Sequence, residues 1–169
     1  EGEGVEYVFG VPGAHVLPFY DGLYRATSIK PVLTKHEAGG AFLAYGYAAA
    51  TGRLGVCCAT VGPGATNAVT GVAAAHMDSV PVLVVTGQVG TKSFGRSAHQ
   101  EATGHGRCVD QVALFRNVTK MSVMLTDKEM VSRTVRTALR VAQSGRPGPV
   151  HLARSEERRV GKECSLLCR

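Results

Sequence analysis

Glu37 is the side chain whose type and position best suit chemistry in this sequence. It follows the short apolar run of residues 32–34 and opens an alanine- and glycine-rich helical pattern, so its carboxylate stands where a strand gives way to a helix. In a parallel sheet that junction lies at the carboxyl edge, where open α/β folds bind ligands, and a helix amino terminus there favours a negative charge. Residues 38–41 are small and leave room for a flat ligand. The alternative is that Glu37 only stabilises the first turn of its helix.

A second candidate is the turn Gly-Pro-Gly-Ala-Thr-Asn at residues 62–67, which follows the apolar run of residues 54–60. It resembles a dinucleotide-binding glycine fingerprint only superficially, because Asn67 stands where a third Gly or Ala is needed and Pro63 stiffens the turn. A tight turn from strand to helix still exposes backbone amides that suit a polar ligand.

The elements that must position these residues alternate between strand and helix, which predicts an α/β fold. We expect an open, mostly parallel sheet with helices on both faces, joined by right-handed crossovers. Strands are expected at residues 6–9, 29–34, 54–60, 81–86, 120–125 and 149–152. Helices are expected at residues 15–25, from Glu37 to a capping Gly52, at residues 68–77, and from a capping box at residues 126–129 to Gly145.

The stretch of residues 89–108 shows no clear period and is long for a connection without secondary structure. Loops of this kind are usually functional or mobile. His99, Glu101 and His105 lie in it, but their spacing matches no metal motif, so we expect them to be solvated loop residues.

Composition excludes several classes of function. A length of 169 residues suits about one domain. The net charge is +6, but Lys and Arg are spread out and not interleaved with aromatic residues, which argues against nucleic acid. We find no run apolar enough for a membrane span and no secretory signal, so a cytoplasmic protein is expected. Cys57 and Cys58 are adjacent in an expected strand, where side chains alternate faces, and the five cysteines are expected to be free thiols.

The character of the sequence changes after Leu152. Residues 1–153 are expected to form one α/β domain of a larger enzyme, and residues 154–169 a disordered or non-native tail without a pattern that fits the domain. This tail resembles the peptide obtained when sequencing-adapter DNA is read as coding sequence.

Five segments in this order resemble the amino-terminal pyrimidine-binding domain of thiamine-diphosphate enzymes of the acetolactate synthase group. The segments are residues 8–13, 35–52, 60–89, 99–101 and 118–120, and the resemblance covers residues 5–152. It implies that Glu37 is the catalytic acid that hydrogen-bonds the cofactor's pyrimidine ring. By the same resemblance the cofactor-binding residues are Pro12, Gly13, Glu37, Gly62, Pro63 and Asn67, and the substrate side holds Gln100 and Lys120.

The resemblance implies a carboligase or decarboxylase of 2-oxo acids, pyruvate foremost, in branched-chain amino acid biosynthesis. In the family a separate carboxyl-terminal domain holds the diphosphate and magnesium, and FAD is possible; a partner subunit in a homodimer or tetramer completes the site. This chain alone is therefore expected to be inactive. Residues 95–101 depart from the family's usual loop sequence, which leaves the substrate open. The alternatives are another thiamine-diphosphate enzyme, a 2-oxo acid decarboxylase or oxidase, and a non-catalytic nucleotide-binding module of the Rossmann type.

Overall fold

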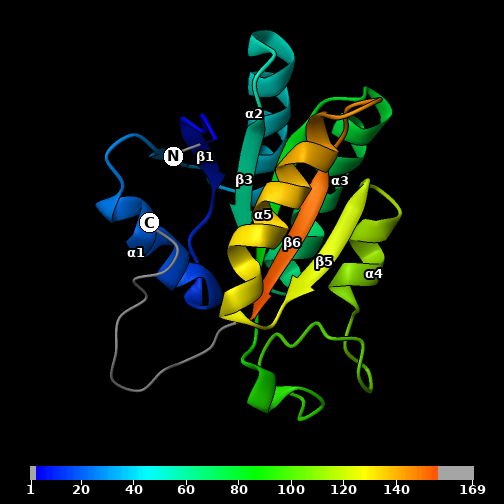
Figure 1. Ribbon diagram of the computed structural model, residues 1–169. Coiled ribbons are helices and arrows are strands. Elements are labelled where there is room, and N and C mark those ends of the chain that lie inside the picture. Colours follow the sequence, from blue (N-terminus) through cyan, green and yellow to red (C-terminus); the bar gives the residue numbers. More distant parts are fainter. Residues whose placement is uncertain (1–2, 156–169) are drawn as a thin grey trace.

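Six strands form one sheet in the computed structural model, which describes residues 3–155. Their order across the sheet is β2-β1-β3-β4-β6-β5, and every neighbouring pair is parallel. Figure 1 shows β1, β3, β6 and β5 following one another across the sheet. The predicted α/β fold is confirmed. The strands are β1 (Tyr7–Gly10), β2 (Lys30–Leu33), β3 (Gly55–Ala59), β4 (Val82–Gln88), β5 (Met121–Leu125) and β6 (Val150–Ser155).

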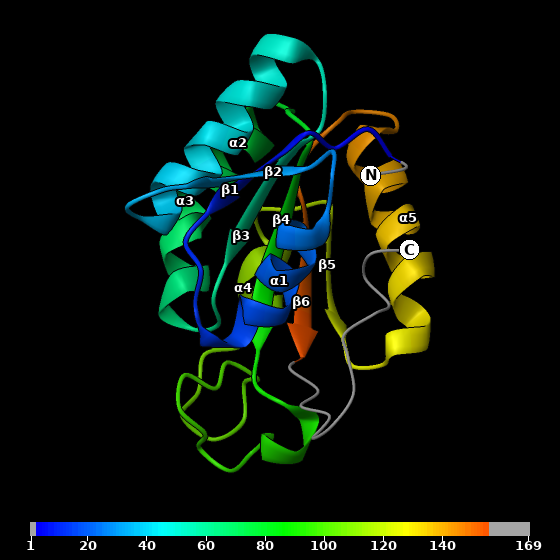
Figure 2. The same cartoon turned by 90° about the vertical axis from the view of Figure 1, so that its left-hand side faces the viewer.

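Helices cover both faces of the sheet, as predicted. One face packs against α2 (Glu37–Thr51), α3 (Pro63–Met77) and α4 (Gln111–Arg116). The other packs against α1 (Leu17–Arg25) and α5 (Lys128–Gln143). Figure 2 shows α2 and α3 on one side of the sheet and α5 on the other. Two short 3-10 turns, η1 (Ala14–Val16) and η2 (Thr91–Ser93), lie in the connections. In the part of the chain that the structure describes, no helix is both long and apolar enough to cross a membrane.

The hydrophobic core has two halves because side chains alternate along each strand. β3 is buried over its whole length, with Cys57 in the half under α2 and α3 and Cys58 in the half under α1 and α5. The two thiols therefore point to opposite faces, as expected, and neither they nor Cys108 form a disulfide. Burial raises the pKa of Cys57 to about 12, so it is an unreactive thiol.

Small residues let α2 lie close to the sheet and to α3. A Cβ on Gly71 would lie 2.7 Å from Cβ of Ala41, and a Cβ on Gly55 would lie 2.0 Å from the carbonyl oxygen of Ala44. At the first turn of α2, a Cβ on Gly40 would lie 3.0 Å from Cα of Gly10, the last residue of β1. The glycines therefore allow the close approach that places the first turn of α2 against the end of β1.

A buried histidine joins the strands at the other side of the sheet. His151 of β6 stacks on Phe115 at 4.1 Å between ring centroids. Ser122 donates its hydroxyl to the Val112 carbonyl (2.8 Å), so it accepts from His151 Nδ1 (2.8 Å), and Nε2 accepts from the Thr86 hydroxyl (2.8 Å). Burial lowers the pKa of His151 to about 3, which keeps the ring neutral. These bonds fix β4, β6 and β5 beneath the long loop that follows β4.

Two element boundaries and one missed helix are the differences from the sequence-based expectation that concern the site or the tail. α3 begins at Pro63 and not at residue 68, because proline is pre-organised for a first helical turn and Gly62 adopts a φ of 67° before it. α4 was not predicted, since its six residues are too few to show a period. β6 continues through Arg154 and Ser155, so the predicted tail boundary is two residues early; Ser155 is buried and donates to the Leu125 carbonyl (3.0 Å). Residues 156–169 lie outside the described part of the chain.

Candidate functional site

The strand order reverses between β1 and β3. The chain places β2 on one side of β1 and β3 on the other, so the carboxyl ends of β1 and β3 flank a topological switch point. Open α/β sheets bind ligands at such points. Most of the residues singled out in the sequence follow strands at this edge: Pro12 and Gly13 after β1, Glu37 after β2, Gly62, Pro63 and Asn67 after β3, and Gln100 after β4.

The Glu37 carboxylate reaches from α2 to α3. The N-cap of α2 is His36, whose Nδ1 accepts from the Ala38 amide (3.2 Å). Glu37 Oε2 instead accepts from the Asn67 side-chain amide at 3.0 Å. Oε1 lies over Gly64, where an added Cβ would be 3.2 Å away. The carboxylate is thus held at the contact between two helix amino-terminal ends, a place that favours negative charge.

Glycines surround Thr60, the first residue after β3. A Cβ on Gly13 would lie 2.6 Å from Cβ of Thr60, and one on Gly64 would lie 2.8 Å from its Cγ2. Thr60 therefore fills the space between the loops that follow β1 and β3, and both positions require glycine. Its buried hydroxyl finds no hydrogen-bond partner within residues 3–155. Sequence reasoning missed Thr60 and Gly64, although both are next to motifs that it used.

Gln100 lies against the turn that precedes α3. Its φ is 61°, and its carbonyl oxygen would be 3.0 Å from a Cβ on Gly62, whose own φ is 67°. A side chain other than glycine is uncommon in this left-handed region, and such conformations cluster at functional sites. The structure therefore brings Gln100 to the same edge as Glu37.

Glu101 is buried, so the expectation of a solvated residue was wrong. Its carboxylate accepts from the Thr103 hydroxyl (2.6 Å), the Gly95 amide (2.6 Å) and the Ala98 amide (3.2 Å). The hydrogen bond from Thr103, followed by that from Gly95, holds the pKa of Glu101 below its ordinary value. In a loop without secondary structure, the Glu101 carboxylate therefore supplies the hydrogen-bond acceptor for two backbone amides. His99 and His105 are exposed, as expected.

Two buried glutamines fasten the long loop to the sheet. Gln88, at the end of β4, donates to the Ala102 carbonyl (2.9 Å) and accepts from the Ala102 amide (3.3 Å). Gln111, at the start of α4, donates to the Gly87 carbonyl (2.8 Å). The segment that carries Gln100 is therefore bound to the sheet from both ends.

Lys120 lies away from this cluster. It immediately precedes β5, so it lies at the amino edge of the sheet, opposite to Glu37. Its ammonium group donates to the carbonyls of Val141 (2.5 Å) and Ser144 (2.7 Å) at the end of α5. Within this chain Lys120 does not lie beside Glu37 and Gln100, because a residue before a parallel strand cannot share an edge with residues after one, and its assignment to the substrate side stays a prediction.

The residues gathered at the carboxyl edge include one carboxylate, that of Glu37, beside Gly62, Gly64 and the left-handed backbone of Gln100. Across residues 3–155 no three His, Cys, Asp or Glu side chains lie together as a metal site would require. A fixed carboxylate beside bare glycine surfaces can hydrogen-bond a nitrogen of a flat heterocycle and allow the ring to approach closely. This is the chemistry that the geometry supports.

Comparison with known proteins gives two kinds of match. The family model described as "Thiamine pyrophosphate enzyme, N-terminal TPP binding domain" matches residues 1–114. A probable acetolactate synthase large subunit of Methanocaldococcus jannaschii is 47% identical over 152 residues, which are 90% of this chain and 24% of the relative. Acetolactate synthase large subunits of Lactococcus lactis (45% over 149 residues; 88% and 25%) and Corynebacterium glutamicum (47% over 145 residues; 86% and 22%) are similar. The chain spans about a quarter of the length of these relatives.

Proposed function

Because the chain belongs to the family of thiamine pyrophosphate enzymes, as their N-terminal TPP-binding domain, we propose that its carboxyl edge binds the pyrimidine ring of thiamine diphosphate. Glu37 is the catalytic residue of this proposal. It hydrogen-bonds a ring nitrogen and shares a proton with it, which is the task of a positioned acid and base. When bound, the cofactor supplies the carbon that adds to a 2-oxo acid.

The observation that supports this role is the position of the Glu37 carboxylate at the switch point. Oε2 is held by Asn67, and Oε1 lies over the bare Cα of Gly64. Pro12 and Gly13 flank the same place from β1, and Gly62 and Pro63 from β3. Glycine at positions 13, 62 and 64 lets Thr60 and the Gln100 backbone lie close beside the loops that follow β1 and β3, so these loops come together next to the Glu37 carboxylate.

For the complete protein we propose an acetolactate synthase-like carboligase of 2-oxo acids, pyruvate foremost, since three relatives are named acetolactate synthase large subunits. We also propose Gln100 as a residue of the substrate side; its left-handed backbone beside the turn before α3 supports this proposal. We assign the diphosphate and Mg²⁺ to a domain beyond this chain, and FAD is a further cofactor to test in the complete enzyme. The proposed compartment is the cytoplasm.

We further propose that another copy of the protein covers α2 and α3 in a homodimer or tetramer. Apart from Glu37, these two helices contain no Asp, Glu, Lys or Arg. Phe42 and Leu43 on α2 and Met77 on α3 are nevertheless exposed, at 44%, 47% and 74%. A helix that is apolar on all sides is normally buried on all sides, so the outer faces suit a covered surface.

The test is Glu37→Gln in the complete enzyme, which keeps the shape but cannot exchange the proton. We expect hydrogen–deuterium exchange at C2 of bound thiamine diphosphate to slow by about 10²–10⁴-fold, the usual contribution of general acid–base catalysis. NMR of quenched samples measures this rate. Glu129→Gln is the matched control, because Glu129 is an exposed acid in the first turn of α5. Near-normal exchange in a folded, cofactor-loaded Glu37→Gln enzyme would reduce Glu37 to an acid of the same kind as Glu129.

A further inference from the structure

The contact between α2 and α3 assigns Asn67 a role different from direct cofactor binding. We propose that Asn67 is a positioning residue, which acts on thiamine diphosphate only through Glu37 by fixing the direction of its carboxylate. The inference rests on the proposed function of Glu37. It concerns a residue that the sequence resemblance places against the cofactor ring itself.

Asn67 reaches Glu37 because α3 begins early. With Pro63 as the first residue of α3, Gly64 and Asn67 are three positions apart and lie on one face of the helix. That face meets the first turn of α2, where Asn67 Nδ2 is 3.0 Å from Glu37 Oε2 and Gly64 lies under Oε1. A turn over residues 62–67 without helix would not place these two groups together.

No part of its own helix holds the Glu37 carboxylate. The Ala38 amide donates to His36 Nδ1, and the Gly40 amide donates to the His36 carbonyl. Within the described residues Asn67 is the hydrogen-bond partner of the Glu37 side chain. A glutamate has several rotatable bonds and samples several rotamers when it is not held, so loss of this bond frees the carboxylate.

The amide group suits the task better than a charged side chain does. It donates a hydrogen bond to Oε2 without neutralising the carboxylate, and it leaves Oε1 for a second partner. A lysine there would form an ion pair, and an aspartate would repel Glu37. An amide side chain at position 67 therefore fixes the direction of the Glu37 carboxylate, and the carboxylate can still take up and release a proton.

A double-mutant cycle in the complete enzyme tests the inference. Its variants are Glu37→Ala, Asn67→Ala and the double variant, with Asn117→Ala as the matched control, since Asn117 is an exposed asparagine at the end of α4 that donates to Ala113. Calorimetry gives the dissociation constant of thiamine diphosphate with Mg²⁺ present, and NMR gives the C2 exchange rate at saturating cofactor. Circular dichroism shows that each variant is folded.

We expect Asn67→Ala to weaken binding or slow C2 exchange by about 10- to 100-fold, the range for one hydrogen bond to a charged group. In the Glu37→Ala background the same change should have less than about a twofold effect, because nothing remains to be positioned. Asn117→Ala should leave both quantities unchanged.

Additive effects of Asn67→Ala and Glu37→Ala would overturn the inference while leaving the proposed function standing, since Asn67 would then contact the cofactor directly. A folded Asn67→Ala enzyme with normal binding and exchange would also overturn it. If Glu37→Ala itself changes neither quantity, the proposed function fails, and the positioning role fails with it.

Discussion

At the carboxyl edge of the sheet, polar groups lie among glycines and strained backbone, whereas at the amino edge three basic side chains have hydrogen-bond or ion-pair partners within the chain. Glu37 has one partner, and Thr60 has a buried hydroxyl without one among the described residues. At the opposite edge, Lys120 binds two carbonyls of α5, and Arg146 donates to the Ser79 hydroxyl (2.5 Å) and the Met77 carbonyl (3.3 Å).

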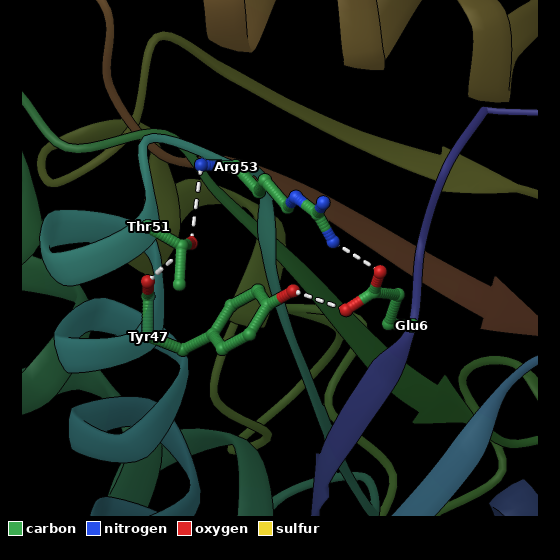
Figure 3. A network of polar contacts seen from close by, with 4 residues as sticks. All are labelled: Glu6, Tyr47, Thr51 and Arg53. Carbon is green, nitrogen blue, oxygen red and sulfur yellow. Dashed lines mark hydrogen bonds and ion pairs between the residues drawn. The ribbon is translucent and has the colours of Figure 1, made fainter.

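The third basic side chain of the amino edge is Arg53, which forms an ion pair with Glu6 beyond the end of α2 (Figure 3). Tyr47 donates its hydroxyl to the other oxygen of the same carboxylate (3.1 Å), and Thr51 bridges Tyr47 and the Arg53 amide. The hydrogen bond from Arg53, then that from Tyr47, lowers the pKa of Glu6. The Glu6 carboxylate therefore has partners for both of its oxygens inside the chain.

The difference has an electrostatic cause. In a parallel sheet with helical crossovers, helices end at the amino edge and begin at the carboxyl edge. Helix ends present carbonyls with partial negative charge, so lysine and arginine can satisfy them locally. Helix starts present amides that favour an anion, which the chain supplies only as Glu37 near α2 and α3. The helix ends at the amino edge are therefore satisfied within the chain by basic side chains, whereas the helix starts at the carboxyl edge favour an anion.

Gly64→Ala should give the largest change of the three substitutions that test this comparison. The new Cβ would meet Thr60 at 2.8 Å and Glu37 Oε1 at 3.2 Å, so it pushes the carboxylate away from its position. We expect a loss of about 1–3 kcal/mol of unfolding free energy from overpacking. Thiamine diphosphate should bind at least about tenfold more weakly, as it does when a hydrogen bond to a charged group is lost.

Gly71→Ala is the control for that effect. It makes the same substitution in the same helix and also overpacks, since the new Cβ would lie 2.7 Å from Cβ of Ala41, but this Cβ would lie one helical turn from the Glu37–Asn67 pair and would not contact Glu37. Denaturant unfolding should show a comparable loss of stability, and calorimetry in the complete enzyme should show unchanged affinity. Equal losses of affinity in both variants would mean that the carboxyl edge is sensitive to packing alone.

Glu101→Gln tests whether the loop of the carboxyl edge depends on one carboxylate. The variant removes the charge to which Thr103, Gly95 and Ala98 donate. We expect the amides of Gly95 and Ala98 to exchange with solvent about tenfold faster at pH 7, in keeping with loss of hydrogen bonds to a charged group. Hydrogen exchange read by mass spectrometry or NMR measures this, with the amides of β4 as the internal control.

The pH dependence of the same loop has a defined sign. Because the pKa of Glu101 is lowered from 4.5 in the folded protein, its contribution to stability is fully present above pH 4.5 and is lost as the pH falls through the lowered value. The wild-type loop should therefore loosen only in acid, whereas Glu101→Gln should show no such step. A step of the same size in the variant would assign the acid effect to another group.

The sequence predicted the sheet and the position of Glu37 because both depend on local patterns. Buried strands such as β3 and β4 are continuous apolar runs, and the junction at Glu37 combines a strand end with a helix start. The burial of Glu101 could not be predicted, since its partners are amides whose direction depends on the fold of the loop. Thr60 and Gly13 lie 47 residues apart in the sequence, so their contact could not be predicted from a local pattern either. The distance of Lys120 from Glu37 could not be predicted either, because a motif match does not show at which end of a strand a residue stands.

Lys120→Met should give the smallest effect and tests the amino edge directly. The variant keeps the aliphatic stem that lies beside Gly148 but removes both hydrogen bonds to the last turn of α5. We expect a loss of about 1 kcal/mol in unfolding free energy, from lost capping of the helix carbonyls and lost charge at the negative end of the helix. Lys128→Met, at the first residue of the same helix, should be neutral or slightly stabilising, because a cation opposes the helix dipole there.

Calorimetric titration of the complete enzyme should give the same thiamine diphosphate affinity for both variants as for the wild type. A tenfold loss of affinity in Lys120→Met alone would show that the amino edge also serves the cofactor site, and the contrast between the two edges would no longer separate structure from function.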